Sequence, residues 1–149
     1  MQREILFRGK RKDTGEWIEG SLVNNLWLNS DIKEPIVEII SGPGNNDNWD
    51  DIADDPECTA QVIPETVGQF TGLLDKNGKL VFGGHLVNIT NKGIYNGPKI
   101  VVWDEILLCH VFVWLDEYDK WTNSSCGITY LKISSGIKCE ITGNIHDKQ

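Results

Sequence analysis

The sequence predicts a mainly β protein, with a small N-terminal antiparallel sheet followed by a C-terminal sandwich or small barrel. Short apolar segments recur along the 149 residues, separated by Gly, Asn and Asp, and little sustained helical periodicity is present. The segments lie roughly ten residues apart, a spacing typical of sandwiches and barrels rather than of parallel sheets with crossover helices. The length fits one domain, or two small ones that share an interface.

The first elements are a hairpin and one further strand. Ile5–Gly9 and Trp17–Val23 flank the polar run Arg11–Gly15, whose glycine can take the positive φ that a hairpin loop needs. Pro35–Ile40 is the next predicted strand, and Ser41-Gly42-Pro43-Gly44 ends it because this sequence continues neither a helix nor a strand ladder. These segments form the predicted N-terminal sheet.

An acidic stretch separates the two halves of the chain. Asn45–Glu57 is rich in Asp and has little apolar content, which indicates a solvated loop. It lacks the acid spacing, the glycine and the closing Glu of a calcium loop. We therefore predict an N-terminal β subdomain over residues 1–60, which includes this acidic loop, and a barrel subdomain over residues 61–149. A single integrated domain is the alternative.

The C-terminal half begins with a short helical turn and a hairpin. Pro64–Val67 has the Pro and Glu favoured in a first helical turn, and Gly68 ends it after one turn. Gln69–Leu74 and Lys79–Phe82 are joined across Asn77-Gly78, which predicts a type I′ turn. The remaining predicted strands are Leu86–Thr90, Ile100–Trp103, Leu107–Leu115, Ile128–Ile133 and the alternating segment Ile137–Ile141.

Two of these strands are apolar almost throughout. Ile100–Trp103 and Leu107–Leu115 read as strands covered on both faces, or as strands that cross a small barrel. The acidic pairs Asp104-Glu105 and Asp116-Glu117 lie at their ends. We interpret these acids as solvated turn residues, although paired carboxylates can also serve acid–base chemistry.

Composition and motifs argue against an enzyme, a metal site and a general nucleic-acid binder. The formal net charge is -8, and neutralising phosphates needs clustered Lys and Arg. Nucleophile elbows, zinc-protease helices and dinucleotide fingerprints are absent from the sequence. We therefore predict no catalytic residues, no cofactor and no metal; a zinc site built from Cys126, Cys139 and a histidine lacks the usual ligand spacing.

The N-terminal residues and the cysteines indicate a cytoplasmic protein. Met1–Lys12 contains only the short apolar run Ile5–Phe7, too brief for a signal peptide or a membrane span. The four cysteines lack the close spacing of a disulfide framework, so we predict free thiols in packed positions.

Three blocks of the sequence are informative together, namely Arg3–Gly9, Gln69–Lys79 and Glu140–Asp147. In this order they resemble the YopX family of phage and prophage proteins. The resemblance implies a mainly β protein with an SH3-like barrel, here the C-terminal one, encoded on a phage or prophage and without an established activity. The family's usual string after the central hairpin is an aromatic residue followed by Glu-Gly-Asp. Here it is Phe82-Gly83-Gly84-His85, and His85 accepts only one backbone bond, as the neutral tautomer.

The leading functional prediction is a non-enzymatic phage accessory protein that binds protein, either a host protein or a second copy of itself. Exposed tryptophans are enriched at interfaces, and two of the six lie among polar residues. The predicted interaction surface consists of Trp49, Asp50, Asp51, Asp54, Asp55 and Trp121. An acidic decoy of a host nucleic-acid-binding protein is the alternative, motivated by the clustered acids. A lesser alternative is nucleic-acid binding by the barrel through Arg8–Lys12.

Overall fold

The computed structural model describes residues 4–25, 36–41, 58–90, 97–123, 130–133 and 136–147. The chain forms two compact units, Met1–Gln69 and Phe70–Gln149. The strands are arranged in two antiparallel sheets, which confirms the predicted mainly β fold. The subdomain assignment of 1–60 and 61–149 stays a prediction. In the described ranges, no helix has the length and the apolar content needed to cross a membrane.

The first unit is an antiparallel sheet around a small apolar core. Its elements are β1 (Phe7–Lys10), β2 (Trp17–Asn25), β3 (Ile36–Ile40), β4 (Thr59–Gln61), the 3-10 turn η1 (Pro64–Thr66) and the start of β5 (Gly68–Leu74). The order is β4-β3-β2-β1-β5, and only the first two residues of β5 pair with β1. Alternate residues of the strands face one side and bury Ile18, Val37, Ile39, Ala60 and Val62. The predicted first hairpin, third strand and single helical turn are confirmed.

The end of β1 also contacts the segment that follows β4. Arg11 and Val62 form an isolated antiparallel bridge, and the Ile63 amide donates to the Lys10 carbonyl at 2.8 Å. The sequence analysis did not identify β4, whose three residues are too few to show an alternating pattern.

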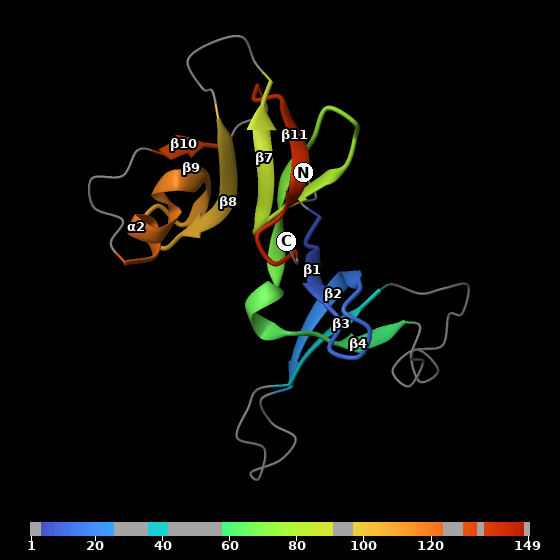
Figure 1. Cartoon of the computed structure of the whole chain (residues 1–149). Helices are drawn as coiled ribbons and strands as arrows, with labels where there is room; N and C mark the ends of the chain where they lie inside the picture. Colours follow the sequence, from blue (N-terminus) through green and yellow to red (C-terminus); the bar gives the residue numbers. More distant parts are fainter. Residues whose placement is uncertain are drawn as a thin grey trace. The chain divides into compact units, whose positions relative to one another are not determined.

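The second unit is built from a five-stranded sheet and a hairpin. The hairpin joins the rest of β5 to β6 (Leu80–Phe82). The sheet has the order β10-β9-β8-β7-β11, and Figure 1 shows β7 between β8 and β11. Its elements are β7 (His85–Ile89), β8 (Pro98–Asp104), β9 (Cys109–Trp114), the 3-10 turn η2 (Leu115–Glu117), α2 (Tyr118–Asn123), β10 (Tyr130–Lys132) and β11 (Cys139–Asn144).

The central strands of this sheet are covered on both faces, as their apolar sequences predicted. On one face, Val101 and Phe112 pack with Leu73 and Val81 from the β5–β6 hairpin. On the other face, Ile100, Val111 and Val113 form a second cluster, with Tyr118 and Trp121 packed against it. Since successive strand residues point to opposite faces, β8 and β9 contribute to both cores.

The type I′ turn predicted at Asn77-Gly78 is wrong. A type I′ turn needs two consecutive residues with positive φ. Gly78 has a φ of 78°, but the φ of Asn77 is not positive. The carboxylate of Asp75 explains the difference. Its Oδ1 accepts bonds from the Asn77 and Lys79 amides, at 2.8 and 2.9 Å, and this favours an Asx-type turn that ends in a left-handed glycine.

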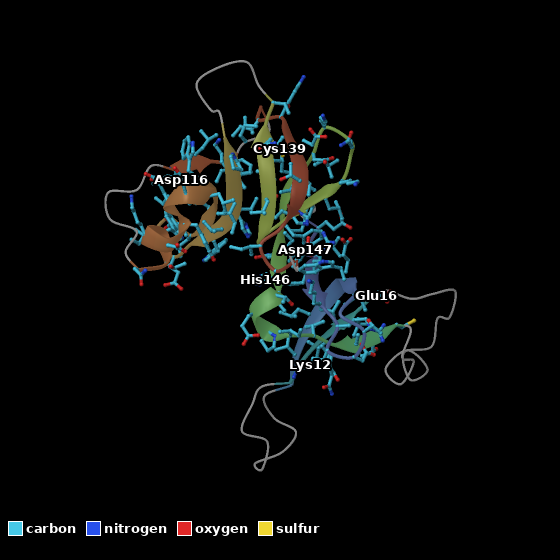
Figure 2. All side chains as sticks on the ribbon, viewed as in Figure 1. Lys12, Glu16, Asp116, Cys139, His146 and Asp147 are labelled. Carbon is cyan, nitrogen blue, oxygen red and sulfur yellow. The ribbon has the colours of Figure 1, made fainter. Side chains whose placement is uncertain are left out.

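Helix α2 and the turn η2 were not predicted from the sequence. The adjacent acids Asp116 and Glu117 lie in η2, and Asp119 lies in the first turn of α2, where negative charge is favourable. Figure 2 shows Asp116 beside α2. The helix is only six residues long, too short to show a 3.6-residue period, so its formation depends on packing by Tyr118 and Trp121.

Neither sheet closes into a barrel within the described residues. The sequence analysis placed an SH3-like barrel in the C-terminal half. The structure establishes a mainly β chain with two open antiparallel sheets.

Candidate functional site

Most of the interaction surface predicted from the sequence lies outside the described residues, namely Trp49, Asp50, Asp51, Asp54 and Asp55. Trp121 is described and lies on α2. It is half-buried, not exposed as expected, because it packs against the cluster of Ile100, Val111 and Val113. Its ring also meets that of Tyr130 edge-on, with centroids 6.3 Å apart. The role of Trp121 as a contact point stays a prediction.

The structure places exposed apolar side chains elsewhere, on the hairpin that joins β8 to β9. Ile106 and Leu108 are 79% and 72% exposed, and Trp103, at the end of β8, is 46% exposed. We call these three residues the apolar tip. Single exposed apolar residues are ordinary, but three within six positions of one hairpin form a candidate contact surface.

A buried carboxylate fixes the loop that carries the tip. Asp104 is 4% exposed, and its Oδ1 accepts bonds from the amides of Ile106 and Leu107, both at 2.8 Å. Asp104 also faces Cys109 in the strand register, and Leu107 packs inward against the second core cluster. The interpretation of Asp104 as a solvated turn residue is therefore wrong. Because the loop is held at both ends, it presents Ile106 and Leu108 in a fixed arrangement.

Leu108 adopts a backbone conformation that leucine rarely takes. Its φ is 53°, and it is the only described residue other than glycine with a positive φ. This region costs a side chain with a Cβ roughly 1–2 kcal/mol per residue. In the β5–β6 hairpin the corresponding left-handed position, after another carboxylate-capped turn, is occupied by Gly78. An exposed leucine at such a position lacks a folding advantage over glycine.

Trp103 is held against the sheet by a neighbouring ring. His110 lies directly opposite it in the register, and the two rings meet edge-on with centroids 5.1 Å apart. His110 is 8% exposed, whereas Trp103 keeps nearly half of its surface in solvent. The indole is therefore oriented by the protein and is still accessible.

The chemistry available at the apolar tip is that of binding. Ile, Leu and Trp side chains transfer no protons and ligate no metals, but each buries a large apolar area when covered. Full burial of Ile106 and Leu108 would contribute about 1.5–3 kcal/mol for each side chain. Sequence reasoning missed this site because Leu107 and Leu108 were assigned to a strand. The turn contains no Gly, Pro or Asn, and Asp104 was its only signal.

Buried titratable groups in the second unit serve structural contacts. Burial opposes ionisation of Asp75, but bonds from the amides of Lys79, Asn77 and Ile141 outweigh it, so its pKa lies below the ordinary 3.8. Burial lowers the pKa of Lys99, whose Nζ donates to the Gly97 carbonyl at 3.0 Å and lies 4.6 Å from the centre of the Trp114 ring.

The described cysteines Cys58, Cys109 and Cys139 are free thiols, and Cys126 lies outside the described residues. Cys139 lies on β11 (Figure 2) and is fully buried. This burial, reinforced by the nearby Asp75 charge, raises the pKa of its thiol to about 11. Among the described residues, no three His, Cys, Asp or Glu side chains come together as metal ligands would.

The two arginines of the basic segment Arg8–Lys12 are engaged by neighbours within their own unit. Arg8 lies 4.5 Å from the centre of the Trp17 ring and pairs with Glu19 at 3.6 Å. Arg11 pairs with Asp13 at 2.9 Å, which raises the pKa of the guanidinium and lowers that of the carboxyl. A phosphate would have to compete with these acids for the same cations.

Comparison with protein families gives one match that spans nearly the whole chain. The family model described as YopX protein matches residues 6–149. No curated protein matches the chain. The family match includes both sheets and the apolar tip.

Proposed function

The chain belongs to the YopX family, and from this premise we propose that it is a phage or prophage accessory protein that acts as a non-enzymatic protein-interaction module. The observation that carries the proposal is the apolar tip. Ile106 and Leu108 are largely exposed on a loop whose backbone is fixed by the buried carboxylate of Asp104. A rigid loop loses little conformational entropy on binding, so more of the burial energy is available as affinity.

The use of buried polar groups supports a non-enzymatic role. Asp75 and Asp104 cap turns, Lys99 bonds a carbonyl, and His85 accepts a backbone amide bond. Each of these groups has a structural explanation of its own. Strongly perturbed groups at enzyme sites are instead found in clefts beside catalytic partners.

The proposed partner is a protein, either a host protein or a second copy of this chain. The test compares Ile106→Ser with Leu74→Ser in the full chain. Leu74 is a matched control because it is 51% exposed on the other hairpin of the same unit. We expect Ile106→Ser to abolish capture of the binding partner from bacterial lysate and Leu74→Ser to leave it unchanged. Equal capture by wild type and both variants would refute the proposal. Light scattering across a concentration series tests whether the partner is a second copy of this chain.

An SH3-like barrel in the second unit belongs to the same proposal. Its support is the way the β5–β6 hairpin meets the edge of the five-stranded sheet: the Lys76 amide donates to the Cys139 carbonyl at 2.8 Å, and hairpin and sheet share one core. Slow amide exchange at Lys76, comparable with that in β8, would support a hairpin joined to the sheet. Exchange at the rate of an exposed loop would argue against it.

The acidic decoy remains a proposal from the sequence, because its residues lie outside the described part of the chain. Replacing Asp50, Asp51, Asp54 and Asp55 by Asn tests it through salt-sensitive capture of host nucleic-acid-binding proteins. Nucleic-acid binding through Arg8–Lys12 is supported less, since Glu19 and Asp13 already pair with Arg8 and Arg11. For all of these roles we place the protein in the bacterial cytoplasm, where free thiols persist.

A further inference from the structure

The apolar tip also indicates which of its residues makes the main contact with a partner, and which kinds of side chain surround that contact on the partner. This step rests on the proposed function, since it assumes that the tip is the contact surface. Two observations carry it, namely the backbone of Leu108 and the charges that flank the loop in the sequence.

The first observation is that Leu108 is both strained and exposed. A left-handed φ of 53° is tolerated readily by Gly and to a lesser extent by Asn. The side chain of Leu108 is 72% exposed, so its packing contributes little to the stability of the fold. Strained residues whose conformation does not serve the folded core are characteristic of binding surfaces.

The second observation is that the charged residues near the tip in the sequence are all acidic. No Lys or Arg lies between Lys99 and Lys120, whereas this segment contains Asp104, Glu105, Asp116, Glu117 and Asp119. Glu105 is exposed on the loop itself, directly before Ile106. A second copy would bring the same acidic loop and a net charge of -8, and an anionic membrane would repel it too. Lys or Arg residues of a partner protein around the contact would complement the charge of this acidic loop.

We infer that Leu108 is the anchor of the apolar tip, and that it inserts into an apolar pocket of a partner protein whose rim carries Lys or Arg. Ile106 packs at the edge of that pocket, and Glu105 faces the basic rim. Because 72% of the Leu108 surface is exposed, its side chain is accessible to such a pocket.

The experiment uses the full chain to capture the partner from bacterial lysate and then titrates the purified partner. Leu108→Gly should raise the thermal midpoint of the protein, because glycine relieves the backbone, and yet weaken binding roughly tenfold or more. Leu108→Met should keep the apolar contact and restore most of the affinity. For wild type, affinity should fall as salt is raised, and Glu105→Gln should make this dependence less steep.

The outcomes separate this inference from the proposed function. If Ile106→Ser abolishes binding but Leu108→Gly binds as wild type does, the anchor assignment is wrong and the interaction module stands. If neither substitution changes binding, both fail. Salt-independent binding, tip-dependent self-association in sedimentation, or tip-dependent binding to vesicles of phosphatidylcholine with or without phosphatidylglycerol would each overturn the basic-rimmed partner.

Discussion

The backbone amide of Phe82 donates a hydrogen bond to Nδ1 of His85 at 3.2 Å, across the turn between β6 and β7, and both residues are buried. Phe82 and His85 also meet edge-on, with ring centroids 5.9 Å apart. An acceptor at Nδ1 requires the neutral imidazole, as expected from the sequence for a histidine at this position. Gly84, with a φ of 87°, supplies the left-handed residue of the turn.

His85→Leu should destabilise the second unit by about 1–3 kcal/mol, because the Phe82 amide loses a buried acceptor. His85→Asn is the matched control, since its amide oxygen can take the place of Nδ1. We expect a smaller loss for the Asn variant. Urea unfolding followed by tryptophan fluorescence measures both; equal losses would show that the ring packing, and not the hydrogen bond, determines the stability.

Asp75 should make the protein sensitive to acid. Its pKa is lower in the folded chain than the ordinary 3.8, so folding favours the carboxylate. The resulting stabilisation is fully present above pH 4 and is lost as pH falls through the lowered folded value. Asp75→Asn should cost roughly 1–3 kcal/mol at pH 7 and flatten this acid-side decline.

The control for the Asp75 measurement is Asp13→Asn. Asp13 also has a lowered pKa, through its bond with Arg11, but the Asp13 side chain is exposed, so solvent screens its contribution. Thermal midpoints measured from pH 7 to pH 3 should therefore follow wild type for Asp13→Asn. A decline for Asp75→Asn as steep as that of wild type would contradict the prediction.

Gly20→Ala should unfold or strongly weaken the first unit. A Cβ at this position would lie 2.0 Å from the backbone oxygen of Ile40, and backbone in a paired strand cannot move aside cheaply. We expect a loss of at least about 3 kcal/mol. At Gly136 an added Cβ would meet none of the described residues within 4 Å, so Gly136→Ala should be close to neutral. Amide exchange in β2 and β3 reports the first unit directly.

Cys139 should resist alkylation in the folded protein. Its thiol is fully buried and its pKa is raised to about 11, so little thiolate exists at pH 8. Iodoacetamide treatment followed by peptide mass spectrometry should find Cys139 unmodified in native protein and modified in urea. The half-buried Cys58 and Cys109 are internal comparisons. Native labelling of Cys139 as fast as that of Cys109 would show that β11 opens readily.

The sequence predicted the elements that have clear local signals. The first hairpin, the turn at Pro64 and the two-sided burial of β8 and β9 follow from glycine placement, proline and continuous apolar runs. Short elements that depend on distant contacts were missed, namely β4 and α2. Neither is long enough for its periodicity to appear in the sequence.

The candidate site was missed for a different reason. Trp121 lies among polar residues in the sequence and was therefore predicted to be an exposed contact point, but α2 packs it onto a core cluster. Leu107 and Leu108 resembled the start of a buried strand, and Ile106 lay outside every predicted strand. The strand register and the capping bonds of Asp104 show that the turn extends from Glu105 to Leu108, and a carboxylate in the sequence does not reveal which amides it will bind.

The position of strand β11 in the chain affects how the protein folds during its synthesis. It is the last described strand in the chain, yet it pairs with β7, and its Cys139 completes a core built from residues that are synthesised much earlier. The Asp75 carboxylate contacts the Ile141 amide across 66 positions of sequence. Until β11 has been synthesised and has paired with β7, the side of the core that Cys139 covers is exposed to water. Late assembly of this kind leaves the nascent chain prone to aggregation and slows its maturation.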